Sequence, residues 1–153
     1  KLKEMGVNIE VNNNSLVISK PKEFKPINVK TLVFPGFATD LGQPMSVLLT
    51  QADGMSIFEE TIYENRMGHI KYLQKMGANI RVNDRTAIIV GNTPLKGEEV
   101  TATDLRAGAA MVIAGLIAKG TTKVNEIEHI LRGYENIVEK LTGVGADILI
   151  KED

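Results

Sequence analysis

The chain repeats itself, and this repetition limits its possible folds more than any other feature of the sequence. The segment 2–12 returns as 73–83, an offset of 71 residues, with Leu, Met, Gly, Asn, Ile, Val and Asn at matching positions. A shortened third copy closes the chain, with the matching residues Leu141, Gly145, Ala146, Asp147, Ile148 and Ile150. Self-similarity at a fixed period indicates copies of one supersecondary unit that stack together.

A second set of residues repeats between these phrases, at a constant offset of 66 residues. Its members are Gly54, Glu60 and Arg66 in one copy and Gly120, Glu126 and Arg132 in the other. Helix, glycine, strand and arginine therefore keep their spacing. We expect a unit of the form βαβαββ over residues 31–96. A second unit over 97–153 lacks its last strand, and residues 1–30 are the tail of a preceding unit plus a linker.

Local patterns predict the elements inside each unit. In the first we expect extended segments at 32–34 and 57–62, helices at 45–52 and 68–76, and a hairpin at 79–90. In the second we expect extended segments at 99–101 and 122–127 and helices at 106–119 and 134–141. The chain opens with the last turn of a helix at 2–5, a glycine stop, and a hairpin built from 9–11 and 16–18.

Repeated βαβ units place their helices on one face of a sheet, so the fold class is α/β (α+β). The run 107–118 is rich in Ala and Gly. Small residues let helices approach each other closely, which suits a buried core helix. They would equally let a backbone approach a ligand.

Composition excludes several classes of function. A net charge of -1 without a basic stripe argues against nucleic-acid binding. The absence of cysteine removes disulfides and thiolate metal sites. The longest apolar run, 107–118, is too short to cross a bilayer, so we expect no membrane insertion. His69 and His129, the two histidines, are expected at the surface or at helix edges and predict no metal site.

Two short motifs each place an aspartate where a predicted extended segment ends and a predicted helix begins. They are Thr39-Asp40-Leu41 and Thr103-Asp104-Leu105-Arg106. An Asp there can accept hydrogen bonds from the unpaired amides of the first turn, so capping alone explains either acid. Their recurrence also fits a pair of functional carboxylates. Arg66 and Arg132 fit either ligand binding or ion pairs with these acids across the repeat.

Four motifs together resemble those of the UDP-N-acetylglucosamine enolpyruvyl transferase (1-carboxyvinyltransferase) family. They are the segments 34–40 (FPGFATD), 60–66 (ETIYENR), 101–106 (TATDLR) and 132–135 (RGYE). The resemblance runs over essentially the whole chain. It implies two domains, each an inside-out α/β barrel of three βαβαββ units, with phosphoenolpyruvate and UDP-N-acetylglucosamine in the cleft between them. It also implies a cytoplasmic enzyme that makes the first committed precursor of peptidoglycan without a cofactor.

The resemblance assigns roles to five residues. It implies that Asp40 contacts the 3-hydroxyl of the sugar and is the general base. Ile62 would contribute a backbone contact to the UDP-sugar, and Arg132 would bind phosphoenolpyruvate. Asp104 and Arg106 would line the same cleft, with Asp104 as a second catalytic candidate.

The resemblance covers about the last third of such an enzyme, so we expect a C-terminal fragment. Its partner would be the missing N-terminal domain, which bears the loop cysteine and the Lys-Asn pair of the family, and the fragment alone would be inactive. Two alternatives stay open. One is a sibling transferase that acts on shikimate phosphate, although the residues at 34–36 (FPG) and 64–66 (ENR) argue against it. The other is a non-catalytic repeat domain whose acids and arginines only join the units.

Overall fold

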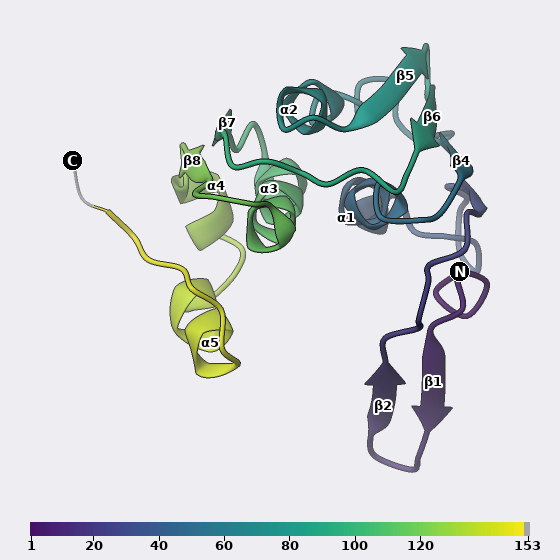
Figure 1. Cartoon of the computed structure of the whole chain (residues 1–153), viewed down its shortest axis with the longest axis horizontal. Coiled ribbons are helices and arrows are strands. Elements are labelled where there is room, and N and C mark those ends of the chain that lie inside the picture. Colours follow the sequence, from purple (N-terminus) through teal and green to yellow (C-terminus); the bar gives the residue numbers. More distant parts are fainter. Residues whose placement is uncertain (152–153) are drawn as a thin grey trace.

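The computed structural model describes residues 1–151, which form short strands around two central helices (Figure 1). The strands are β1 (Asn8–Val11), β2 (Leu16–Ser19), β3 (Asn28–Lys30), β4 (Met55–Glu59), β5 (Asn79–Asn83), β6 (Thr86–Val90), β7 (Glu99–Thr101) and β8 (Lys123–Asn125). The helices are α1 (Gly42–Leu49), α2 (Ile70–Lys75), α3 (Leu105–Ile117), α4 (Glu128–Leu131) and α5 (Ile137–Gly143), and the 3-10 turn η1 (Thr39–Leu41) precedes α1.

The largest sheet has the strand order β3-β4-β6-β5. β3 runs parallel to β4, with Val29 opposite Phe58, whereas β6 is antiparallel to both of its neighbours. Burial alternates along β4 and β6, so Phe58, Ala87 and Ile89 face the core. This period of two lets one face of the sheet cover the helices while the other faces solvent.

A second parallel pair, β7 and β8, repeats the arrangement of β3 and β4, with Val100 opposite Val124. A helix connects the strands of each pair, α1 in the first and α3 in the second. These two helices pack together in the middle of the molecule, where Val47 and Leu49 of α1 share one core with Met111 and Ala114 of α3 (Figure 1). The core of the chain is therefore built where the two predicted units meet.

The same glycine stop occurs in all three copies of the repeated phrase. Gly6, Gly77 and Gly145 have φ values of 92, 98 and 96°. In each copy the glycine amide donates to the carbonyl three residues back, and the next amide donates to the carbonyl five residues back. These are the bonds that close a helix end around a residue with positive φ. The glycine-stop prediction is thus confirmed, although residues 2–6 form turns and no full helix.

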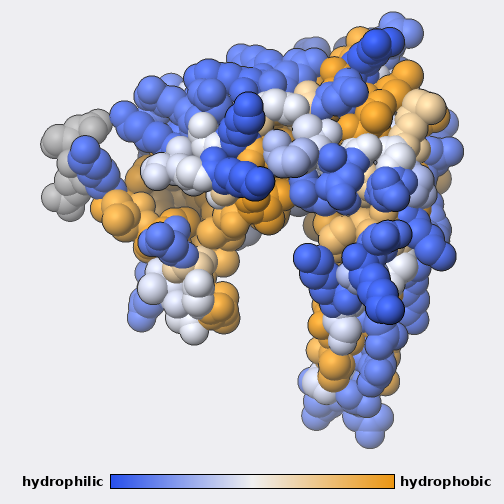
Figure 2. Space-filling view, in the orientation of Figure 1, coloured by the Kyte–Doolittle hydropathy of each residue, from blue (hydrophilic) through white to orange (hydrophobic). Residues whose placement is uncertain are grey.

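The opening hairpin projects away from the rest of the molecule (Figure 1). β1 and β2 pair antiparallel, with Ile9 opposite Ile18, as the sequence predicts. Their apolar side chains remain at the surface, and Figure 2 shows them as orange patches along a narrow arm. The exposed members are Val11, Leu16, Val17 and Ile18.

Some predicted elements are wrong. The segment 32–34 is no strand: the Leu32 amide donates to the Phe37 carbonyl and the Gly36 amide to the Val33 carbonyl, so the chain turns here. The first strand of this unit is instead β3, which lies before residue 31. Residues 146–151 form no strand, and α4 lies in a segment for which no helix was expected. The division of the chain at 31 and 97 remains a prediction.

Among residues 1–151, no helix combines the length and apolar character that crossing a bilayer requires.

Candidate functional site

Asp40 lies at the meeting point of three segments. Its carboxylate, in η1, accepts a hydrogen bond from Arg66 Nη1 at 2.8 Å. It also accepts two bonds from Arg106 of α3, from Nε at 2.5 Å and from Nη2 at 2.9 Å. The two-pronged contact with Arg106 joins residues 66 positions apart and links the two predicted units.

This double contact sets the charge of the acid. The Arg106 hydrogen bonds, followed by the Arg66 bond, lower the pKa of Asp40 to about 2. Asp40 in turn raises the pKa of Arg106. The side chain of Asp40 is still 55% exposed. The site therefore presents an ionised carboxylate that solvent or a ligand can reach.

Asp104 behaves differently from Asp40, although both follow a threonine and precede a leucine. Asp104 is the N-cap of α3, and its Oδ1 accepts bonds from the amides of Arg106 at 2.8 Å and Ala107 at 3.0 Å. Neither η1 nor α1 has a side-chain cap. Capping therefore describes Asp104, while the interpretation of Asp40 as a helix cap is wrong.

Glu60 holds several segments of the site together, and the sequence motifs did not predict it as a site residue. Only 1% of it is exposed. Its carboxylate accepts bonds from the hydroxyls of Thr31 (2.8 Å) and Thr39 (2.7 Å) and from the amides of Ile62 (2.8 Å) and Tyr63 (3.1 Å). Burial raises its pKa, but these four bonds outweigh burial and the net pKa is lowered. Its match with Glu126 in the repeat was the available signal.

A shallow hollow opens beside these groups. Its lining residues are Ile62, Tyr63, Glu64, Asn65, Arg66, Asp104 and Arg106. The Tyr63 ring lies 3.9 Å from Arg66 Cζ and helps to hold the guanidinium in place. The Ile62 amide already donates to Glu60. The predicted backbone contact from Ile62 to a ligand would therefore use its carbonyl oxygen.

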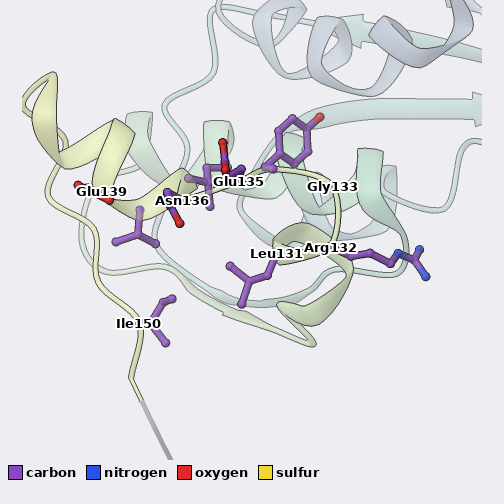
Figure 3. Close-up of a pocket in the computed structure, with 10 residues that line it drawn as sticks. Leu131, Arg132, Gly133, Glu135, Asn136, Glu139 and Ile150 are labelled. Atoms are coloured by element: carbon purple, nitrogen blue, oxygen red, sulfur yellow. The ribbon is translucent and has the colours of Figure 1, made fainter.

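Arg132 is not among the residues that line this hollow, although its neighbour Gly133 lies against Leu105 of α3. Arg132 ends α4 and borders a different hollow together with Leu131, Asn136, Glu139 and Ile150 (Figure 3). Figure 3 shows its side chain extending away from that hollow. Within residues 1–151 it forms no ion pair, so it does not tether an acid across the repeat. Its expected role in binding phosphoenolpyruvate remains a prediction.

His69 contradicts the expectation of a surface position. It has no exposed surface, and its Nε2 lies 2.7 Å from Ser46 Oγ. Its place immediately before α2 directs the ring into the core beside α1. The part of the chain that the structure describes contains no group of three His, Cys, Asp or Glu residues able to hold a metal ion.

Comparisons with known proteins agree on one family. The family model of EPSP synthase (3-phosphoshikimate 1-carboxyvinyltransferase) matches residues 1–141. UDP-N-acetylglucosamine 1-carboxyvinyltransferase 2 of Bacillus subtilis is 52% identical over 149 residues, and that of Geobacillus kaustophilus is 50% identical over 148. Each match covers 97% of this chain and 35% of the relative, so the chain spans about a third of the length of these proteins.

Solved structures give the same fold. The enolpyruvyl transferase NikO from Streptomyces tendae has a TM-score of 0.88 and 29% identity, over 95% of this chain and 34% of that one. An EPSP synthase from Acinetobacter baumannii has a TM-score of 0.69 and 21% identity, over 97% of this chain and 35% of that one. These likenesses confirm the predicted α/β fold of the enolpyruvyl transferase type.

Proposed function

Because the chain belongs to the EPSP synthase (3-phosphoshikimate 1-carboxyvinyltransferase) family, we propose that it serves as part of an enolpyruvyl transferase. The acceptor that we propose is the 3-hydroxyl of UDP-N-acetylglucosamine, and the donor is phosphoenolpyruvate. Relatives about half identical to this chain carry the name of that reaction, which favours the UDP-sugar over shikimate phosphate. We place the reaction in peptidoglycan precursor synthesis in the cytoplasm.

The observation that carries the proposal is the ionised Asp40 carboxylate between Arg66 and Arg106, at the edge of a hollow. In the transfer, the sugar oxygen bonds to the central carbon of phosphoenolpyruvate as its hydroxyl proton leaves, and the methylene carbon gains a proton. The tetrahedral adduct then loses this added proton and inorganic phosphate, which restores the double bond. A carboxylate beside the hydroxyl accepts or orients its proton.

The arginine contacts tune this carboxylate. At a pKa of about 2, Asp40 is a hydrogen-bond acceptor and a weak base. An anionic substrate that draws Arg106 away would remove the largest cause of the lowered pKa, and the basicity of Asp40 would rise. Arginine suits this exchange because its planar fork can form two-pronged contacts with either a carboxylate or a phosphate. Substrate binding and activation of Asp40 are thereby coupled.

Substituting Asp40→Asn in the two-domain enzyme tests the proposed role. The amide keeps the size of the side chain but loses its basicity and its charge. We expect kcat to fall on the order of 10²–10⁴-fold. The thermal midpoint should change little, because exposed ion pairs contribute about 0–1 kcal/mol. Near-normal turnover would rule Asp40 out as the base.

Calorimetric titration distinguishes the acceptors. The chain would be titrated with UDP-N-acetylglucosamine and, separately, with shikimate 3-phosphate, and circular dichroism would verify that it is folded. Binding of the UDP-sugar alone, weakened by Asp40→Asn, supports the proposal. Binding of shikimate phosphate instead would favour the sibling reaction. Binding of neither, together with normal turnover of the Asp40→Asn enzyme, would favour a repeat domain whose charged residues only join its units.

A further inference from the structure

The buried carboxylate of Glu60 is connected to Asp40 through a continuous chain of hydrogen bonds. Thr39 donates its hydroxyl proton to Glu60 Oε2 at 2.7 Å. The lone pairs of that hydroxyl are then available to Arg66 Nη1, which lies 3.0 Å away. The same Nη1 donates to Asp40 Oδ1 at 2.8 Å. Glu60 thus orients the hydroxyl that helps to orient the arginine.

The other oxygen of Glu60 fixes the loop from which Arg66 projects. Glu60 Oε1 accepts the amides of Ile62 and Tyr63, so the backbone turns tightly directly after β4. The Tyr63 ring then lies against the Arg66 guanidinium at 3.9 Å. Both oxygens of one carboxylate therefore determine where Arg66 and the lining of the hollow lie.

The second unit forms the same βα framework without a buried acid and its surrounding hydrogen bonds. Thr31 and Ala102 occupy equivalent places, since the Thr31 amide donates to the Glu59 carbonyl and the Ala102 amide to the Asn125 carbonyl. Alanine cannot donate a side-chain hydrogen bond to an acid. Glu126, which matches Glu60 at the 66-residue offset, is exposed and has a φ of 55°.

Four hydrogen bonds offset the desolvation cost of burying the Glu60 carboxylate, and the second unit forms its βα framework without a buried acid at this place. We propose that Glu60 is a positioning residue, which holds Thr39, Arg66 and the 62–66 loop so that Asp40 meets the acceptor hydroxyl in a fixed geometry. This inference rests on the proposed function of Asp40. Glu60 is 1% exposed, so it acts through Thr39 and Arg66.

The test measures the Asp40 pKa by carboxyl-carbon NMR titration of the 153-residue chain. The variants are Glu60→Gln and Thr39→Val, with Glu126→Gln as the matched control and Thr39→Ser as the rescue. We expect the first two to raise the Asp40 pKa above that of the parent chain, because a displaced Arg66 no longer stabilises the carboxylate. The control and the rescue should match the parent.

The direction of the change separates positioning from simple electrostatics. Removing the negative charge of Glu60 without displacing Arg66 would lower the Asp40 pKa, because one repelling charge is lost. Thr39→Val removes no charge, but it removes the hydroxyl that bonds to both Glu60 and Arg66. It therefore decides the question if Glu60→Gln fails to fold. An unchanged or lowered Asp40 pKa in folded Thr39→Val would overturn the proposal.

Kinetics of the two-domain enzyme separate this inference from the proposed function. A misplaced catalytic group costs up to about 10²-fold, so Glu60→Gln should lower kcat roughly 10- to 100-fold while Glu126→Gln leaves it unchanged. Normal turnover in Glu60→Gln alongside a large loss in Asp40→Asn would overturn the positioning role alone. Normal turnover in Asp40→Asn would overturn both.

Discussion

The imidazole of His69 lies in the core between α1 and α2, where it has no exposed surface. Ser46 of α1 meets it at 2.7 Å. Burial lowers its pKa to about 4, against smaller opposing effects of the Arg66 backbone and the Asp104 carboxylate. The ring is therefore neutral at physiological pH, and protonating it would place a charge in the core beside Ser46.

His69 predicts a pH-dependent stability. The ordinary histidine pKa is 6.5, so between pH 6.5 and 4 the unfolded chain binds a proton that the folded chain excludes. The free energy of unfolding should fall as pH falls through this window, by about 3 kcal/mol in total. Urea unfolding at pH 7, 5.5 and 4 measures it, and His69→Gln should remove most of the slope. A Gln variant as pH-dependent as its His129→Gln control would contradict this origin.

The small residues of α3 serve packing. A β-carbon added at Gly108 would lie 2.4 Å from Ile130 Cγ1 of α4 and 3.0 Å from Ala102. At Gly115 it would lie 3.2 Å from Thr122 Cβ. Because side chains of this chain fill the space around both glycines, they mark close contact between elements. Of the two interpretations of the Ala- and Gly-rich run, the core helix accounts for these positions.

Gly108→Ala should destabilise the chain. The added methyl group overlaps Ile130, and relieving such overpacking costs about 1–3 kcal/mol. Gly143→Ala is the matched control, because Gly143 ends α5 and an added β-carbon there meets nothing within 4 Å. That control should be neutral or slightly stabilising, since alanine favours helix. Denaturant midpoints compare the two, and equal effects would mean that α4 moves aside without cost.

The whole molecule is two parallel-strand pairs joined through α1 and α3, with the Asp40–Arg106 contact bridging them at one edge. The β1–β2 hairpin stands apart (Figure 1), and the underside of the central helices shows orange apolar surface in Figure 2. Arg132 lines one hollow, whereas Arg66 and Arg106, the partners of Asp40, line another.

We predict that the 153-residue chain turns over nothing by itself. It contains no cysteine, and it spans about a third of the length of its curated relatives, so groups that the resemblance assigns to the reaction lie outside it. Phosphate release in the presence of both substrates provides the assay, with heat-denatured chain as the blank. Turnover above that blank, in material free of longer enzyme, would mean that this chain holds all the required groups.

The sequence by itself determined the repeat, the glycine stops, the opening hairpin and most of the helices. These features depend on local chemistry, because a residue with positive φ favours glycine and apolar alternation favours a strand wherever they occur. The family motifs likewise singled out Asp40, Ile62 and Arg106. The fold brings Arg106 into contact with Asp40 and places Ile62 and Arg106 along one hollow, and the roles of the three residues remain predictions. The extent of each helix and strand shifted by a few residues, since packing decides where an element ends.

Only the tertiary structure decided what equivalent residues do. The phrase Thr-Asp-Leu places Asp104 as a helix cap but Asp40 between two arginines, one of them 66 positions away. Glu60 is buried with hydrogen bonds from Thr31 and Thr39, whereas Glu126 is exposed in the unit that has Ala102 at the place of Thr31. A residue's charge and burial depend on neighbours that the fold brings from distant parts of the chain, and a local sequence pattern cannot predict those neighbours.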